Sequence, residues 1–345
     1  MSQALSILFV GNRFEGSTSF QRLRAFQDLG HRTRLVASGD GFLPPGSLYR
    51  RIRNRLGWPC ENMDENRCLL NAMRQAQPDL VWVEKGLTIR PGTLVALKKI
   101  APACRIVSFS ADDMMNPRNQ SWFWRRCLAL YDVHVTTKSP NIEELRAAGA
   151  RKVVFTPKAY DPHTHRPVEL TAEERMKWGA RVGFVGSFEA ERAQSIRALG
   201  EQGISVRVWG GGWERMKAVP PPIGIVGRAV YGDDYARGIC ATDINLCFLR
   251  KMNRDRQTAR SVEIPACGAF MLAERTDEHL GLFEEGVEAD FFGDDSELIA
   301  KVAHFLRHNE ERRRIADGGR RRCLEGGYSH ACRLEPVLTA IMEGR

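Results

Sequence analysis

Short apolar runs alternate with longer segments of helical periodicity along this 345-residue chain. The first apolar run covers residues 5–11, and a Gly/Ser/Thr loop, a predicted helix over 19–29 and a predicted strand over 33–37 follow it. The same order recurs over 181–212, again with the tripeptide Phe-Val-Gly in the opening run. A strand, a glycine-containing loop, a helix and a second strand are the opening of a doubly wound nucleotide-binding fold.

Further apolar runs continue this alternation in both halves of the chain. Because helical stretches separate them, the pattern predicts parallel sheets and an α/β fold. Two such openings half a chain apart predict two Rossmann-like domains that face each other. The additional predicted strands cover residues 80–83, 104–109, 133–137, 153–156, 224–227 and 244–249.

The predicted domain boundary is the window 157–167, because three prolines interrupt regular structure there. We therefore expect a first domain over residues 1–160 and a second over 168–333. Helical periodicity returns from Ser296 onward. A final helix, within 334–345, is expected to cross back to the first domain.

Composition limits the classes of partner. The formal net charge of +9 favours anionic partners, but no zinc-finger or RNA-recognition signature points to nucleic acid. Nine cysteines without metal-ligand spacing argue against a disulfide framework and against a zinc site. The N-terminus lacks the features of a signal peptide, so we expect a cytoplasmic protein. We also expect neither a cofactor nor a metal.

The segment 47–58 has an apolar stripe among arginines. This pattern is compatible with peripheral contact to the inner face of a membrane. A helix that packs on its own domain is the alternative.

Residues 255–268 carry the most informative pattern. Arg260 and Glu263 are three residues apart and would share one face of a helix, with Thr258 and Ser261 as capping residues. An arginine at a helix N-terminus suits a phosphate, and a carboxylate one turn later suits a ribose diol. The alternative is an ordinary surface ion pair.

Three further groups of residues are candidates because of their place after predicted strands. Gly186, Ser187 and Arg192 follow the first strand of the second domain, where a glycine admits a phosphate. The first-domain loop with Gly16 and Ser17 is expected to line the cleft between the domains. Asp112 and Asp113 follow the strand 104–109, where open α/β sheets bind ligands. Plain turns, an Asx turn or a helix cap are the alternatives.

Several segments of the chain have a familiar sequence pattern. They are 245–255, 258–270, 284–288, 311–316 and 328–330, with 108–113 and 156–162 in the first domain. Through these segments, residues 240–333 and shorter stretches of the first domain resemble the CgeB-like (spore maturation protein B type) glycosyltransferases. The resemblance implies a GT-B fold with the nucleotide-sugar held mainly by the second domain.

The related retaining family 4 glycosyltransferases have a Glu-x7-Glu pattern, and the resemblance places its second glutamate on Glu263. Its first position falls on Asp255, which has a shorter side chain. Pro265 lacks the amide hydrogen that a regular helix needs, so we expect this helix to be distorted or to start late.

These considerations predict a glycosyltransferase that needs no metal and moves a sugar from a nucleotide-sugar to an acceptor hydroxyl. The acceptor (a glycan, a lipid-linked molecule or a protein) is left open. Arg260 would act at the leaving diphosphate, and Asp112 or Asp113 would act on the acceptor. The predicted donor-binding residues are Gly186, Ser187, Arg192, Trp209, Gly210, Val226, Arg228, Asn253, Asp255, Thr258, Arg260, Ser261 and Glu263.

Two other function classes remain open from the sequence. One is a nucleotide-sugar-binding or regulatory protein without transfer activity. The other is a nucleotide-sugar epimerase or hydrolase.

Overall fold

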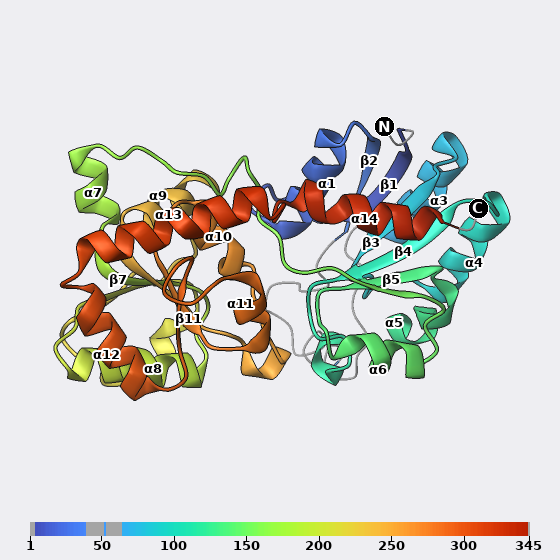
Figure 1. Ribbon diagram of the computed structural model, residues 1–345. Helices are drawn as coiled ribbons and strands as arrows, with labels where there is room; N and C mark the ends of the chain where they lie inside the picture. The colour runs from blue at the N-terminus through green and yellow to red at the C-terminus, as the bar shows by residue number, and fades with distance from the viewer. Residues whose placement is uncertain (1–3, 39–51, 53–63, 344–345) are drawn as a thin grey trace. The chain divides into compact units, whose positions relative to one another are not determined.

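The computed structural model describes residues 4–38, 52 and 64–343. The chain divides into two compact units, Met1–Pro157 with His330–Arg345, and Lys158–Ser329. Figure 1 shows a parallel sheet with helices in each unit. The predicted segment 47–58 lies outside the described residues except for Ile52.

The first unit contains a six-stranded parallel sheet in the order β2-β1-β3-β4-β5-β6. From β1 the chain adds β2 on one side, and from β3 it adds the later strands on the other side. The sheet therefore has a topological switch point between the parallel strands β1 and β3. The strands are β1 (Ser6–Gly11), β2 (Arg32–Ala37), β3 (Leu80–Glu84), β4 (Arg105–Ser110), β5 (Val133–Thr136) and β6 (Val153–Phe155).

Both faces of this sheet are covered, because alternate strand residues enter two separate cores. Phe9 and Trp82 belong to one core, and Val10 and Val83 belong to the other. The strands therefore appear in the sequence as continuous apolar runs. The helices of the unit's first segment are α1 (Thr18–Asp28), α3 (Glu65–Ala76), α4 (Pro91–Ile100), α5 (Trp122–Cys127) and α6 (Asn141–Ala147), with short 3-10 turns η1 (Pro117–Asn119) and η2 (Leu128–Leu130).

The C-terminal helix α14 (His330–Met342) belongs to the first unit, although the whole second unit precedes it in the chain. Its apolar residues Leu334, Val337, Leu338 and Ile341 are buried in the core that α1 also covers. Figure 1 shows α14 alongside α1. The chain thus returns to the first unit at His330.

The second unit contains a parallel sheet in the order β12-β11-β10-β7-β8-β9. Its switch point lies between β7 and β10, because the chain winds outward from β7 in one direction and from β10 in the other. The strands are β7 (Ala180–Val185), β8 (Val206–Trp209), β9 (Ile223–Ile225), β10 (Thr242–Cys247), β11 (Met271–Glu274) and β12 (Asp290–Phe292).

The helices of the second unit again cover both sheet faces. They are α7 (Ala172–Trp178), α8 (Ala190–Glu201), α9 (Gly232–Cys240), α10 (Arg260–Ala266), α11 (Asp277–Leu282), α12 (Asp295–Phe305) and α13 (Asn309–Glu325), with 3-10 turns η3 (Trp213–Arg215) and η4 (Lys251–Asn253). Among the described residues, no helix combines the length and apolarity needed to cross a bilayer.

The proline-rich window 157–167 contains neither helix nor strand, and from Lys158 onward it is part of the second unit. The Lys158 N–H donates to the Gln257 side chain, and the Tyr160 N–H donates to the Tyr328 carbonyl. Its Asp161 side chain accepts a hydrogen bond from the Thr164 hydroxyl at 2.6 Å. The expected linker is therefore an ordered segment of the second unit.

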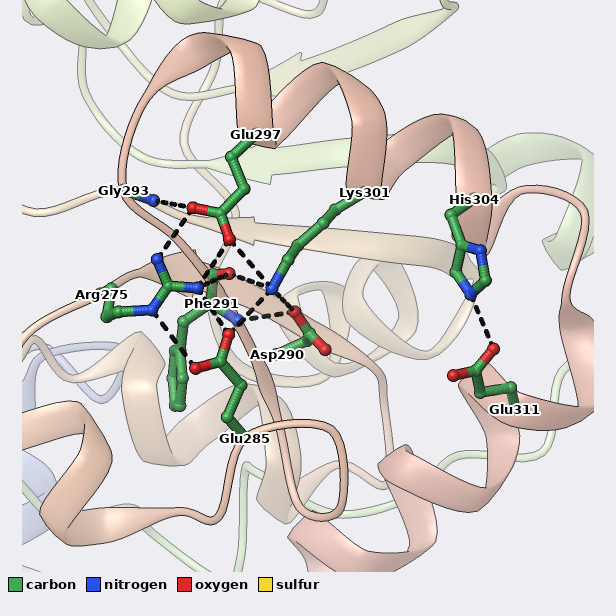
Figure 2. Close-up of polar contacts among 9 residues, drawn as sticks. All are labelled: Arg275, Glu285, Asp290, Phe291, Gly293, Glu297, Lys301, His304 and Glu311. Atoms are coloured by element: carbon green, nitrogen blue, oxygen red, sulfur yellow. Dashed lines mark hydrogen bonds and ion pairs between the residues drawn. The ribbon is translucent and has the colours of Figure 1, made fainter.

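A network of charged side chains ties β11, β12 and α12 together (Figure 2). Arg275 donates to both Glu285 and Glu297, and Lys301 bonds Glu285 and Asp290. Hydrogen bonds from Arg275 lower the pKa of the Glu297 carboxyl to about 2. This network stabilises the edge of the second sheet.

Candidate functional site

In the second unit, the loops that follow β7 and β10 meet at the switch point. Open α/β sheets bind ligands at this point, because the loops after the two adjacent strands lead to opposite faces of the sheet and leave a crevice between them. The loop after β7 contains Gly186 and Ser187, and the loop after β10 begins at Phe248. Among the described residues, the Ser187 N–H has no hydrogen-bond partner.

Arg192 on α8 connects these two loops through hydrogen bonds to both of them. Its guanidinium donates to the carbonyl of Leu249 through Nε and to that of Ser187 through Nη1. The side chain is only 3% exposed, and Nη2 is buried without a hydrogen bond, 3.9 Å from a Glu189 oxygen. Burial, and then the positive charge of Arg260, lower the pKa of Arg192 to about 10. Arg192 therefore stays cationic at neutral pH in a site with excess positive charge.

Arg260, the first residue of α10, supplies the second cation of this site. Its Nη2 donates to the Phe248 carbonyl at 3.2 Å, and its guanidinium lies 5.4 Å from the centre of the Phe184 ring. The Nε atom is buried without a partner, and within the described residues no carboxylate lies at ion-pair distance from Arg260. Two neighbouring arginines without full neutralisation form an electropositive site that suits an anion.

Close packing explains the glycines beside the arginines. A Cβ atom on Gly186 would lie 2.6 Å from the Phe184 ring and 3.4 Å from Arg260 Nη1. Gly210 has φ = +142°, and a Cβ there would lie 2.0 Å from the Gly186 carbonyl oxygen. Larger residues would push the loop away from the arginines.

Four of the predicted donor-binding residues, Trp209, Gly210, Val226 and Arg228, have different environments. The Gly186 N–H donates to the Trp209 carbonyl, and the Gly210 N–H donates to the Arg228 carbonyl, so the structure brings these backbones together. The Trp209 indole is 1% exposed within a core cluster and cannot stack on a ligand base. Only the backbone of the turn at Trp209 is available to contact a ligand base. Val226 is partly buried and Arg228 is exposed.

Glu263 is nearly buried and bonded to residues that the sequence did not indicate. Its Oε2 accepts a hydrogen bond from the Tyr235 hydroxyl at 2.8 Å. Burial raises the pKa of Tyr235 well above its usual value, so this hydroxyl stays protonated as a donor. His165 Nδ1 accepts from the Asp161 N–H, which leaves the hydrogen of a neutral ring on Nε2, 3.6 Å from Glu263 Oε1. Oε1 therefore retains acceptor capacity.

Thr258 and Ser261 do not act as the predicted caps. The N-cap of α10 is Ala259, and no side chain caps the helix. Ser261 is fully buried, and its hydroxyl accepts from the Thr258 N–H and contacts His279 Nε2 at 2.6 Å. These partners occupy the hydroxyl, so Ser261 cannot contact a donor substrate. The helix begins at Arg260 and is seven residues long, with Pro265 inside it.

Asp255 stabilises the turn in which it lies. Its Oδ2 accepts from the Arg250 N–H at 3.3 Å, and its Oδ1 accepts from the Asn253 amide at 2.8 Å. Asn253 is itself buried. The structure thus brings Asp255 and Asn253 together, and both contribute to the shape of the loop that precedes α10.

A second candidate surface is a cavity of about 350 Å³ in the first unit. It lies at the carboxyl ends of β1, β3 and β4, beside the β1/β3 switch point. Ser17 caps α1 by accepting from the Phe20 N–H, and it lines the cavity together with Asp112. The neighbouring Gly16 does not line this cavity, so the structure joins Ser17, but not Gly16, to Asp112.

A buried ion pair forms part of the cavity wall. Arg22 of α1 binds Glu84 with both ends of its guanidinium, at 2.8 and 2.5 Å. The indole Nε1 of Trp82 also donates to Glu84, and the Arg22 guanidinium lies 4.1 Å from the centre of the Phe109 ring. Such a buried, bidentate pair fixes the geometry of a polar surface.

Asp112 is half-buried and pairs with Lys85 at 2.7 Å. Lys85 has φ = +59°, and the following Gly86 has φ = +68°. A non-glycine residue in this conformation costs on the order of 1 kcal/mol and is frequent at functional sites. The hydroxyls and charges around this cavity suit a polar, hydroxyl-bearing ligand.

Asp113 has a structural role. It is 2% exposed, and its Oδ1 accepts from the Asn141 amide at 2.7 Å and from the Met115 N–H at 3.0 Å. The second bond is the Asx turn that the sequence left as an alternative. Asp113 does not line the cavity, so the structure joins Asp112, but not Asp113, to this surface.

Sequence reasoning missed several residues of these two surfaces. Glu84 is the last residue of β3 and Lys85 follows it, as Asp112 follows β4, so the carboxyl-end rule could have indicated them. Tyr235 and His165 gave no comparable signal, because their contact with Glu263 depends on tertiary packing.

Comparisons with known proteins agree with this architecture. Residues 192–339 match a family model described as glycosyl transferase-like. HepE of Anabaena, solved in complex with UDP-glucose, is 13% identical, with a TM-score of 0.65 over 97% of this chain and 100% of that chain. No curated protein matches the chain in sequence.

Two further solved structures share the fold. Sucrose-phosphate synthase of Thermosynechococcus elongatus is 12% identical, with a TM-score of 0.67 over 99% of this chain and 100% of that chain. A putative UDP-N-acetylglucosamine 2-epimerase of Listeria monocytogenes is 13% identical, with a TM-score of 0.60 over 98% and 96% of the two chains. The chain thus has the GT-B fold, as predicted above, and its residues 192–339 are similar to the glycosyl transferase-like family.

Proposed function

We propose that the protein transfers a sugar from a UDP-sugar to an acceptor hydroxyl, with retention of configuration and without a metal ion at the donor diphosphate. The pair formed by Arg192 and Arg260 carries this proposal, because no described carboxylate pairs with Arg260 and Arg192 keeps a buried Nη2 without a hydrogen bond. The UDP-glucose complex of the structural neighbour HepE supports the nucleotide, and the resemblance to CgeB-like enzymes supports retention.

Loss of the sugar leaves negative charge on the departing diphosphate. Fixed cations and N–H donors stabilise that charge without reorganisation at the moment of reaction. Arg192 is held rigidly by two carbonyls, and Arg260 and the Ser187 N–H lie at the same pair of loops. These groups take the role that a metal ion has in other transferases.

The other assignments follow from hydrogen-bonding capacity. Glu263 would accept the ribose hydroxyls through Oε1, while Tyr235 holds its other oxygen. The turn at Trp209 and Gly210, with Val226 and Arg228, would flank the base. Asp112 would take the proton of an acceptor hydroxyl, and Lys85 would orient its carboxylate.

Incubations in excess EDTA, with and without an acceptor, test the reaction class. A panel of UDP-sugars is supplied with and without simple sugar acceptors, and UDP release and sugar products are followed by chromatography. We expect acceptor-dependent release of UDP that EDTA does not abolish.

Other outcomes would overturn parts of the proposal. Turnover of donor alone would identify an epimerase or hydrolase, and binding without turnover would identify a binding protein. Loss of activity in EDTA with rescue by Mg²⁺ or Mn²⁺ would contradict the cation-based mechanism.

A further inference from the structure

Three metal-ligating side chains gather where α12 ends and α13 begins. They are His304 on α12, His308 at the N-cap of α13, and Glu311 in the first turn of α13. One potential ligand atom from each lies within 4.8 Å of the other two. The two imidazole rings stack with their centres 4.0 Å apart and an angle of 18° between the rings.

The hydrogen bond of His308 involves Nδ1, so Nε2 is the ring nitrogen that can bind a metal. Its Nδ1 lies 2.7 Å from the His304 carbonyl oxygen, which can only accept. Nδ1 therefore carries the hydrogen, and the lone pair of the neutral ring is on Nε2. Metal-binding histidines are commonly oriented by such a bond from the other ring nitrogen to a carbonyl.

His304 and Glu311 face each other directly, as Figure 2 shows. The His304 Nε2 lies 2.8 Å from Glu311 Oε2, so a hydrogen now occupies the space between the two potential ligands. Both side chains are partly exposed, at 45% and 35%. They have room to rotate apart when an ion replaces this hydrogen.

We propose that His304, His308 and Glu311 form a binding site for a divalent transition-metal ion of the zinc class. Two imidazoles and one carboxylate match the ligand preference of Zn²⁺. Bonds of about 2.0–2.1 Å in a tetrahedral site put ligand atoms about 3.4 Å apart. The contact between His304 and Glu311 then lengthens by roughly 0.6 Å.

The bound ion would fasten the end of α12 to the first turn of α13. It leaves at least one coordination position to water, because this cluster supplies three ligands. The site shares no residue with the arginine pair or with the first-unit cavity. The proposal therefore stands independently of the proposed transfer reaction, which stays free of metal.

A Zn²⁺ titration of the tag-free, chelator-stripped full chain tests the site by calorimetry. The test variant is the His304→Gln/His308→Asn double substitution, which removes both imidazole ligands while the amide introduced by His308→Asn can still donate to the carbonyl of residue 304. His163→Gln is the matched control, because His163 is an exposed histidine of the same unit. Wild type and control should bind one more equivalent of Zn²⁺ than the double variant.

A thermal-unfolding series gives an independent readout, because binding to the folded state raises the melting temperature. Zn²⁺ should raise it in wild type and in the control more than in the double variant, and Mg²⁺, which prefers oxygen ligands, should raise none of them. Equal Zn²⁺ stoichiometry and affinity in wild type and the double variant would overturn the proposal.

Discussion

Replacement of Arg260 by alanine gives the sharpest test of the anion site. A hydrogen bond that involves a charged group contributes about 1.5–3 kcal/mol. Loss of one such bond to a diphosphate weakens UDP binding about 10- to 100-fold. Isothermal calorimetry with UDP measures this change directly. Arg260→Lys should give an intermediate loss, because lysine keeps the charge but lacks the planar fork.

Stability measurements separate this role from a structural one. Arg260→Ala loses the bond to the Phe248 carbonyl, but it also removes the positive charge that helps to lower the pKa of Arg192. These two effects oppose each other, so the free energy of unfolding should change less than the free energy of UDP binding. An arginine with only a structural role would show the reverse.

A matched control is available on α8. Arg197 donates to the carbonyls of Lys217 and Ala218, so Arg197→Ala also removes an arginine that bonds backbone. UDP affinity should not change in this control. If a folded Arg260→Ala protein binds UDP within about twofold of wild type, well below the change expected from a lost charged hydrogen bond, the arginine pair is not the diphosphate site and the proposed function loses its main support.

Three further predictions concern carboxylates. Glu263→Gln keeps the shape but loses the charge, so calorimetry should show a larger loss of affinity for UDP than for its 2′,3′-dideoxy analogue; equal losses would exclude the ribose contact. Asp112→Asn should bind UDP normally and lose transfer activity, and full activity would remove this carboxylate from the mechanism. Arg275 lowers the pKa of Glu297 from 4.5 to about 2. The ion pair between them therefore stabilises the folded state fully above pH about 4.5, and this stabilisation is lost as the pH falls toward 2. Urea unfolding should therefore show the stability difference between wild type and Arg275→Gln shrinking over that window, and a constant difference would contradict the assignment.

The fold could be predicted because the sheets are buried on both faces. Strands such as β3 and β10 then appear as unbroken apolar runs, and the intervening helices imply parallel order. The resemblance of residues 240–333 to a known family added the GT-B architecture. Strand order within each sheet could not be read from the runs, because it depends on contacts between distant segments.

The candidate site was predictable in part, since the signals were local. Arg260, Gly186 and Arg192 were indicated by their place after strands or at a helix start, and the structure brings them together. Asp112 and Asp113 were indistinguishable in sequence. Asp113 is held by Asn141, 28 residues away in the chain, whereas Asp112 lines the cavity. Only the tertiary fold separates the two.

The expected helix caps were wrong for a similar reason. Ser261 has the right chemistry for a cap, but its hydroxyl bonds His279 and the Thr258 N–H instead. Distant partners also explain why Tyr235 was missed, since nothing near it in sequence indicates the contact with Glu263. Side chains whose partners lie elsewhere in the chain need a structure.

The return of α14 to the first unit has a consequence for synthesis on the ribosome. The residues up to Pro157 emerge first, but the helix that covers Phe9 and Phe26 emerges only after the whole of Lys158–Ser329. At about 5–20 residues per second, the nascent chain waits on the order of 10–30 s for that helix. The second unit is contiguous and can complete its core while the apolar surface of the first is still uncovered. Nascent chains paused before His330 should therefore be a preferred target for chaperones.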